Sequence, residues 1–153
     1  MKKIAVFPGS FDPFTKGHED IVLRGTHFFD EVIVGIGNNT QKSRTFSVEH
    51  MKQLIEECFN GNPKVGVAVY TGLTSHFAKQ VGACAILRGL RNTTDFEYEN
   101  TIAQVNKYLN EDLETVFLIT SPSLAYISSS IVRELYKFGT DVSSFLPYKL
   151  PQS

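Results

Sequence analysis

Short apolar segments alternate with amphipathic segments along the whole chain. The apolar segments are rich in β-branched residues and almost free of polar ones, as expected for strands covered on both faces. The strands that this pattern predicts are Lys3–Phe7, Glu31–Gly37, Val65–Tyr70, Cys84–Arg88 and Thr115–Thr120. The helices predicted from helical periodicity are His18–Phe29, Val48–Phe59, Ser75–Val81, Asp95–Leu109 and Ser129–Phe138.

Five strand–helix units in succession predict an α/β fold. We expect a single Rossmann-like, doubly wound domain over residues 1–153, with a five-stranded parallel sheet and right-handed crossovers. No repeat, low-complexity tract or linker divides the chain. Ligands of such folds bind outside the carboxyl ends of the strands, so the loops that follow strands are the candidates for a functional site.

One helix carries a regular apolar row. Tyr98, Ile102, Val105 and Leu109 recur at helical spacing in the fourth predicted helix. Such a row is typical of a core-facing side, although part of it could line a pocket.

Composition and charge exclude several classes of protein. The formal net charge of the chain is -1, whereas a non-specific nucleic-acid binder carries a marked positive excess, so any anion site must be local. Pro8 and Gly9 interrupt the first apolar run too early for a secretory signal, and no stretch is long enough to span a membrane. Cys58 and Cys84 lack metal-type spacing and are interpreted as buried, reduced thiols, which suits a cytoplasmic protein.

The loop after the first strand has the features of a phosphate site. Gly9 permits a tight turn, and Thr15 can cap the next helix, which places Gly17 and His18 in its first turn. Free N–H groups and the helix dipole favour a phosphate there, and Ser10 adds a hydroxyl. An ordinary strand–helix turn is the alternative, but the whole string in this position favours function.

This loop carries the first resemblance to known proteins. Gly9-Ser10-Phe11-Asp12-Pro13, followed by Thr15-Lys16-Gly17-His18, resembles the T/H-x-G-H signature of the nucleotidyltransferase superfamily. In that superfamily the final histidine contacts phosphates and stabilises the transition state, so the resemblance implies a catalytic role for His18.

Cations follow two further strands. Lys42 and Arg44 come after the second predicted strand, and Arg88 and Arg91 flank the end of the fourth. Because parallel strands end at one edge of a sheet, three of these cations can converge with the histidine on one anionic ligand. Arg44 is interpreted instead as a solvated surface residue, and Glu99, taken alone, as part of a solvated helix surface.

Three serines open the last predicted helix, at Ser128, Ser129 and Ser130. One of them is needed as the N-cap. The other hydroxyls and the free N–H groups predict a cradle for the outer phosphates of ATP.

A more specific resemblance covers the chain from Ile4 to about Pro147. Arg88-Gly89-Leu90-Arg91, followed by Asp95-Phe96-Glu97-Tyr98-Glu99, resembles the phosphopantetheine adenylyltransferase family in particular, and Ile127-Ser128-Ser129-Ser130 resembles its I-S-S-S element. The residues that the resemblance implies for catalysis are His18, Lys42 and Arg91. Those that it implies for ATP are Ser10, Phe11, His18, Gly89, Leu90, Arg91, Glu99, Leu124, Ala125, Tyr126, Ile127, Ser128, Ser129 and Ser130. Those that it implies for the acceptor are Ser10, Lys42, Leu73, Thr74, Arg88, Tyr98, Ile102 and Asn106.

The resemblance implies in-line transfer of the adenylyl group of ATP to 4'-phosphopantetheine, giving dephospho-CoA and pyrophosphate in coenzyme A biosynthesis. The attacking phosphate is already a nucleophile, so positioning and charge stabilisation suffice. Mg²⁺ is expected to arrive with ATP, because no dense carboxylate cluster predicts a site made only of protein ligands. A homohexamer built as a dimer of trimers is also implied.

Two alternatives remain open at this point. One is another small-molecule nucleotidyltransferase, of the nicotinate mononucleotide adenylyltransferase or glycerol-phosphate cytidylyltransferase type. The other is a non-catalytic nucleotide-binding module on the same fold, because a fold alone does not set function.

Overall fold

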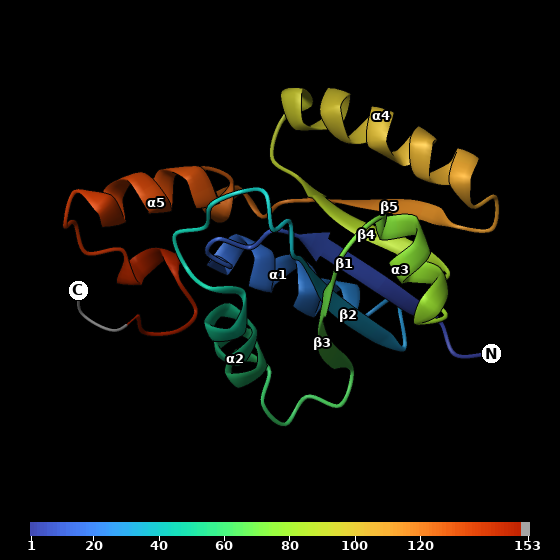
Figure 1. Ribbon diagram of the computed structural model, residues 1–153, viewed down its shortest axis with the longest axis horizontal. Helices are drawn as coiled ribbons and strands as arrows, with labels where there is room; N and C mark the ends of the chain where they lie inside the picture. Colours follow the sequence, from blue (N-terminus) through green and yellow to red (C-terminus); the bar gives the residue numbers. More distant parts are fainter. Residues whose placement is uncertain (151–153) are drawn as a thin grey trace.

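A parallel sheet with helices on both faces forms the centre of the computed structural model, which describes residues 1–150 (Figure 1). The strands of this sheet are β1 (Ile4–Gly9), β2 (Glu31–Gly37), β3 (Val65–Tyr70), β4 (Ala85–Leu90) and β5 (Glu114–Ile119). Their order is β3-β2-β1-β4-β5, and every neighbouring pair is parallel. The predicted Rossmann-like fold with a five-stranded sheet is therefore confirmed. The strand order reverses between β1 and β4, where such folds bind ligands.

The predicted helices are all present with shifted ends. The helices of the described residues are α1 (Lys16–Gly25), α2 (Val48–Cys58), α3 (Thr74–Gln80), α4 (Thr93–Leu109) and α5 (Ser129–Lys137), with 3₁₀ turns at Pro122–Leu124 and Ser143–Phe145. Helix α1 begins earlier than predicted because Thr15 caps it. It ends earlier, at Gly25, which packs so closely on the sheet that a Cβ there would lie 2.5 Å from the Leu87 Cδ2 atom.

Alternating side chains divide the core between the two faces of the sheet. Ala5 and Phe7 of β1 belong to the cluster that α1 and α2 cover. Val6 and Ile86 belong to the opposite cluster, which includes Phe77 of α3. The central strands are therefore covered on both faces, as their continuous apolar character predicts.

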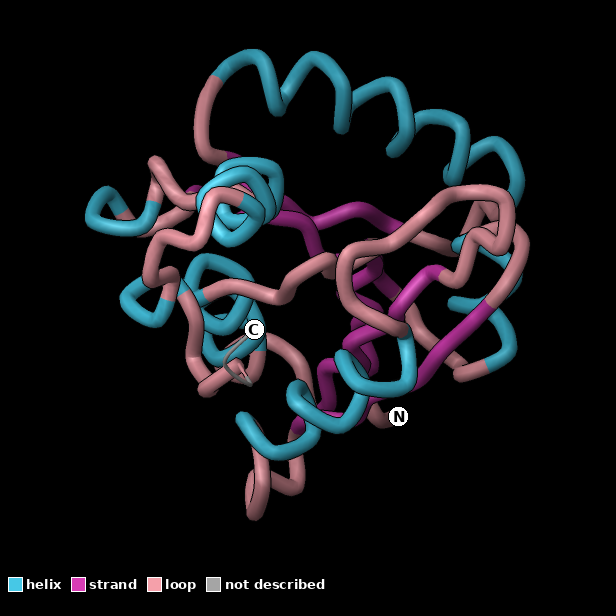
Figure 2. Tube along the Cα trace, turned by 60° about the vertical axis from the view of Figure 1, so that its left-hand side comes forward, coloured by secondary structure: helices cyan, strands magenta, loops and turns pink. Residues whose placement is uncertain are grey.

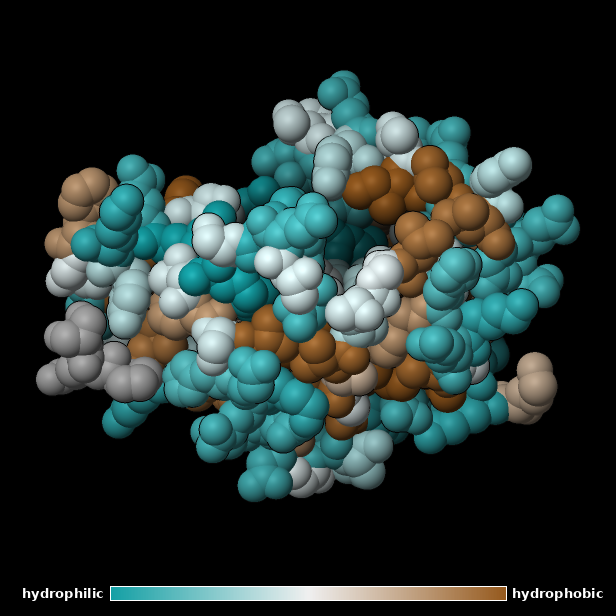
Figure 3. All heavy atoms as spheres, in the orientation of Figure 1, coloured by the Kyte–Doolittle hydropathy of each residue, from teal (hydrophilic) through white to brown (hydrophobic). Residues whose placement is uncertain are grey.

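Helix α4 runs along the outer side of the molecule, above β4 and β5 in Figure 1, and Figure 2 shows the same arrangement from another side. The prediction that its apolar row faces the core is wrong. Tyr98, Ile102, Val105 and Leu109 are 68%, 37%, 53% and 43% exposed. The sheet-facing side of the helix carries the buried Glu99 instead. The alternative, that part of the row lines a pocket, is confirmed, because Tyr98 and Ile102 line a cavity beside Glu99. Hydrophobic residues accordingly gather on the surface over α3 and α4 (Figure 3).

Neither cysteine lies in a site loop. The prediction of buried thiols is wrong for Cys84, which is exposed because it stands just before β4 at the amino edge of the sheet, whereas Cys58 is half-buried. Burial, with a smaller effect from Glu19, raises the pKa of Cys58 to about 12, which keeps this thiol protonated. Within residues 1–150, no helix combines the length and apolar character needed to cross a membrane.

Candidate active site

Two cavities open where β1 and β4 end. The first, of about 720 Å³, is bounded by the loop after β2, the end of β3 and helix α4. The second, of about 420 Å³, is bounded by the β1–α1 loop, the end of β4 and the start of α5. Gly9, Ser10, Arg88 and Glu99 line both cavities. Ligands in the two cavities would therefore meet at a shared wall.

The β1–α1 loop is folded tightly over its own glycine. A Cβ on Gly9 would lie 2.9 Å from the ring of Phe11, so only glycine fits beneath that ring. Phe11 itself has a φ of 46°, in the left-handed region that non-glycine residues rarely adopt. Such local strain persists only where the surrounding structure holds it, and it is typical of functional loops.

His18 sits at the third position of α1 with its ring orientation fixed. The Thr15 backbone N–H donates to the His18 Nδ1 atom at 2.9 Å, and the Thr15 side chain accepts from the His18 N–H, which together form a capping box. Because a backbone N–H can only donate, Nδ1 carries no proton. The proton of the neutral ring therefore resides on Nε2.

The surroundings keep the His18 ring neutral. Phe7, Phe11 and Phe14 lie around it, with ring-centroid distances of 6.0, 5.0 and 5.3 Å. Burial, followed by the positive charges of Arg88 and Arg91, lowers the pKa of His18 from 6.5 to about 3. The residue thus offers a neutral N–H donor to the second cavity, which it lines.

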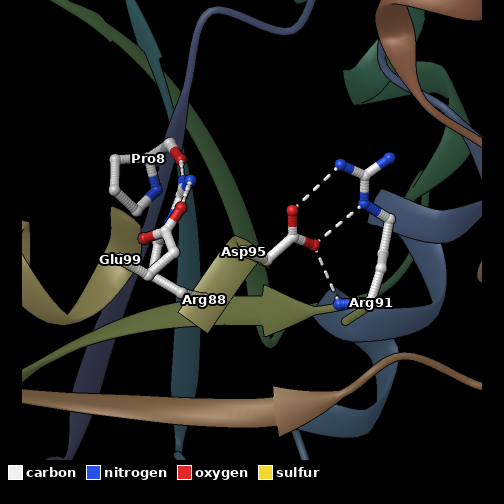
Figure 4. Close-up of polar contacts among 5 residues, drawn as sticks. All are labelled: Pro8, Arg88, Arg91, Asp95 and Glu99. Carbon is white, nitrogen blue, oxygen red and sulfur yellow. Dashed lines mark hydrogen bonds and ion pairs between the residues drawn. The ribbon is translucent and has the colours of Figure 1, made fainter. Parts of the chain in front are cut away.

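Each arginine at the end of β4 is paired with a carboxylate of α4 (Figure 4). Arg88 donates from Nε and Nη2 to the two carboxylate oxygens of Glu99, at 2.8 and 2.5 Å, and from Nη1 to the Pro8 carbonyl. Arg91 donates to both oxygens of Asp95, at 3.0 and 3.1 Å. Burial alone would raise the pKa of Asp95, but the hydrogen bonds and charge of Arg91 outweigh it and lower that pKa.

Two sequence-based interpretations of charged residues are wrong. Glu99 is not part of a solvated surface but is 6% exposed, because its carboxylate pairs with Arg88 between the two cavities. Arg44 is half-buried and not a freely solvated residue, because its guanidinium donates to the backbone carbonyls of Ser10, Phe11 and Phe46. In both cases tertiary hydrogen bonds fix a side chain that local sequence assigns to the surface.

The three serines have separate roles at the start of α5. Ser128 is the N-cap and accepts from the Ile131 N–H at 3.2 Å. The hydroxyl of Ser129 donates to the Pro13 carbonyl at 2.8 Å, so its hydrogen is not available to an anion. The Ser130 hydroxyl receives a hydrogen bond from Arg133 and keeps its own hydrogen free to donate. The predicted phosphate cradle therefore has fewer free hydroxyl donors than expected, although all three serines line the second cavity.

Arg133 is a cavity residue that the sequence analysis missed. It lines the second cavity, donates to the Asp12 carbonyl at 2.8 Å, and contacts Ser130 at 3.2 Å. Its spacing is the signal that could have found it, since a residue four positions after Ser129 shares that serine's side of a helix.

The cavities concentrate positive charge in a chain whose net charge is -1. The charged residues that line them are Lys42, Arg88, Arg91, Arg133, Asp95 and Glu99, with His18 neutral. Four cations against two carboxylates leave a local charge of +2, which suits an anionic ligand.

The structure brings most of the predicted site residues to the two cavities. Those predicted for the acceptor that line the first cavity are Ser10, Lys42, Thr74, Arg88, Tyr98, Ile102 and Asn106, and Leu73 does not line it. Those predicted for ATP that line the second cavity are Ser10, Phe11, His18, Gly89, Arg91, Glu99, Leu124, Ile127, Ser128, Ser129 and Ser130. Leu90, Ala125 and Tyr126 stand next to lining residues without lining that cavity themselves.

The sequence is similar to a known family model and to several curated proteins. The class of protein is cytidylyltransferase-like, because residues 6–135 match the model of that family. A phosphopantetheine adenylyltransferase of Cytophaga hutchinsonii is 63% identical over 150 residues, which cover 98% of this chain and all of that protein. The phosphopantetheine adenylyltransferase of Porphyromonas gingivalis is 51% identical over 95% of this chain and 95% of that protein. The one of Flavobacterium johnsoniae is also 51% identical, over 96% of this chain and 95% of that protein. The chain belongs to the phosphopantetheine adenylyltransferase family.

A solved structure of low sequence identity shares the fold. A bifunctional NMN adenylyltransferase/ADP ribose pyrophosphatase from Francisella tularensis superposes with a TM-score of 0.73 at 18% identity, over 99% of this chain. This chain spans 46% of that larger one. A second structure of the same protein, complexed with AMP and a manganese ion, gives a TM-score of 0.70.

The depressed pKa of His18 predicts how stability depends on pH. An unfolded histidine titrates near 6.5, whereas the folded one stays neutral down to about pH 3. The unfolded state therefore binds more protons between these values, and stability falls as pH falls through this window.

His18→Gln removes the titration, and glutamine at this position still accepts from the Thr15 N–H. Between pH 7 and pH 5 the wild type should lose about 1–2 kcal/mol more than His18→Gln, or roughly 2–8 °C in Tm. Thermal melts of both proteins at both pH values measure this, and an equal pH dependence would contradict the assignment.

Proposed function

We propose that this protein transfers the adenylyl group of ATP to 4'-phosphopantetheine, giving dephospho-CoA and pyrophosphate in coenzyme A biosynthesis, and that residues 1–153 act as one nucleotidyltransferase domain. The single observation that carries the proposal is the wall that the two cavities share at Gly9, Ser10, Arg88 and Glu99. Direct transfer between two substrates needs both reacting groups at one place, and this wall provides that place beside His18. Relatives that carry the name of this activity, at 63% and 51% identity, support it.

The acceptor is proposed to occupy the first cavity and ATP the second. The first cavity is lined by Lys42 and Arg88 and also by Tyr98 and Ile102 of α4, which suits a phosphate joined to a partly apolar arm. The second cavity combines His18, Arg91, Arg133 and the start of α5, which suits a chain of phosphates.

The chemistry proposed for the site is in-line attack of the acceptor phosphate on the α-phosphorus of ATP. His18 donates from Nε2 to the oxygen on which charge grows, and Lys42 and Arg91 stabilise the same charge. Interactions that strengthen only in the transition state raise turnover, so these donors act by being in place beforehand. No covalent nucleophile is needed, because the phosphate oxygen itself attacks.

Magnesium is proposed to reach the site with ATP, where it would neutralise charge on the phosphate oxygens. The two carboxylates that line the cavities, Asp95 and Glu99, each accept two hydrogen bonds from an arginine side chain. With these oxygens engaged, a metal held mainly by the triphosphate fits the residues present.

Identification of products tests the proposed function. Pure protein with ATP and magnesium should turn over 4'-phosphopantetheine far better than nicotinate mononucleotide or glycerol phosphate, and mass spectrometry should identify dephospho-CoA. Equal or better use of either competitor, or of CTP in place of ATP, would favour another nucleotidyltransferase. ATP binding without turnover of any of these acceptors would favour a non-catalytic nucleotide-binding module.

Turnover should depend strongly on His18. Removal of one preorganised donor costs about 2.7–4 kcal/mol, so His18→Ala should lose at least roughly a hundredfold in kcat and bind ATP within about tenfold of wild type. His50 is a matched control, because it holds the same third position in α2 behind the N-cap Ser47 and lines neither cavity among the described residues. His50→Ala should leave kcat unchanged. Turnover of His18→Ala within about threefold of wild type, well below that expected loss, would refute the mechanism.

A homohexamer in the cytoplasm is proposed as the working form. The part of the apolar row of α4 that lies outside the first cavity, Val105 and Leu109, is extended by Tyr108 at 84% exposure and supports burial of this surface against another copy of the chain. Obligate interfaces between identical chains are rich in such residues. A cytoplasmic location suits a reaction that consumes ATP.

Sedimentation tests the assembly. The protein should sediment as a hexamer at micromolar concentration, and Val105→Asp should dissociate it, because an unpaired charge would be buried at the interface. Gln53→Asp adds the same charge at an exposed position of α2 and should leave the hexamer intact. A wild type that is monomeric and fully active would remove this part of the proposal.

A further inference from the structure

Arg44 joins two loops that belong to different parts of the site. Its Nε donates to the Phe46 carbonyl at 2.9 Å, within the loop after β2. Its Nη1 and Nη2 donate to the Ser10 and Phe11 carbonyls at 2.6 and 3.0 Å, in the β1–α1 loop. One planar guanidinium thus satisfies three backbone acceptors, an arrangement that suits the fixed fork of arginine.

A second set of hydrogen bonds joins the same two loops, this time through a side chain of the β1–α1 loop and the backbone of the loop after β2. The Asp12 carboxylate accepts from the backbone N–H groups of Thr45 and Phe46, at 2.9 and 2.8 Å. Asp12 and Phe46 are both buried, with 7% of each residue exposed. The end of the loop after β2 is therefore fixed to the β1–α1 loop by four hydrogen bonds.

The connection lies next to two cavity residues. Lys42 stands two positions before Arg44 and lines the first cavity, but its own side chain is exposed. Ser10, whose carbonyl Arg44 holds, lines the wall common to both cavities. Phe11, the other acceptor, has the left-handed backbone that folds the loop over Gly9. Arg44 itself lines neither cavity among the described residues.

We propose that Arg44 is a positioning residue that sets the place of Lys42 relative to Ser10 and His18. This inference rests on the proposed function, in which Lys42 must meet the acceptor phosphate beside the shared wall. A flexible lysine gains catalytic value only when its loop is held, since a displacement of about 1 Å can cost up to roughly a hundredfold in rate. Arg44 acts through its hydrogen bonds to carbonyls and not through its charge on the substrate.

A mutant cycle with Lys42 tests the proposal. Arg44→Ala should lose about tenfold or more in kcat/KM for 4'-phosphopantetheine while KM for ATP changes little, as expected for lost orientation of one group. In a Lys42→Ala background the same change should cost less than about twofold, because residues that act through one another are not additive. Arg44→Lys keeps the charge but loses the fork, so it should not restore wild-type kinetics. Full additivity, or rescue by Arg44→Lys, would overturn the proposal.

Two further measurements separate this proposal from loss of stability and from failure of the proposed function. Arg24 is a matched control, because it also donates to a backbone carbonyl, that of Ile119 at 2.9 Å, and lines neither cavity among the described residues. Arg24→Ala should lower Tm without the change in kcat/KM. Hydrogen exchange at residues 39–46 should rise in Arg44→Ala even if the wild type turns over a different acceptor, because exchange reports the loop directly. Unchanged exchange there would overturn the proposal whatever the substrate.

Discussion

The backbone of the β1–α1 loop is held by side-chain donors from the elements around it, and both cavities depend on that arrangement. Regular secondary structure cannot pair the carbonyls of such a loop, and buried carbonyls left unpaired are costly. The loop carbonyls and their donors are Ser10 and Phe11 with Arg44, Asp12 with Arg133, Pro13 with Ser129, and Phe14 with Tyr148, and Arg88 holds the Pro8 carbonyl at the end of β1 just before the loop. The loop that carries Ser10 and leads to His18 is therefore tied to β4, to α5, to the loop after β2 and to the segment that follows α5. The relative position of the two cavities follows from these ties.

The arginines at the end of β4 show how a site can recognise anions without holding them too tightly. Pairing with Glu99 and Asp95 fixes the planes of Arg88 and Arg91 in advance, so little rotamer freedom remains to be lost when a phosphate arrives. The same pairing offsets their charge and reduces the affinity for any anion, substrate or product alike. Binding that is equal for substrate and transition state does not raise turnover, so the loss of affinity has little cost for catalysis. The remaining excess of positive charge comes from Lys42 and Arg133.

The sequence predicts features whose cause is local and misses those whose cause is distant. Strands, helices and the capped start of α1 follow from periodicity and from residues a few positions apart, and the structure confirms them. Arg44 reaches a carbonyl 34 positions away, and Arg133 reaches one 121 positions away, so no local pattern could reveal either contact. The apolar row of α4 is a different case, because its period is correct. Periodicity identifies the apolar side of a helix but not whether that side packs on the sheet, lines a cavity or stays exposed.

The geometry around His18 restricts what this residue can do in the proposed reaction. Its Nδ1 atom is occupied by the Thr15 N–H, and a pKa near 3 means that the ring gains no proton at neutral pH. A ring in this state is a poor general base, because a base must accept a proton near the working pH. The ring is also not a cation at neutral pH. What it can contribute to the reaction is therefore one hydrogen-bond donor, Nε2–H, held in a fixed direction. That restriction matches the chemistry of a phosphate nucleophile, which attacks without deprotonation and needs only a donor for the oxygen charge that develops. In the proposed reaction the aromatic side chains of Phe7, Phe11 and Phe14 would therefore act indirectly, since they bury the ring and so disfavour its charged form.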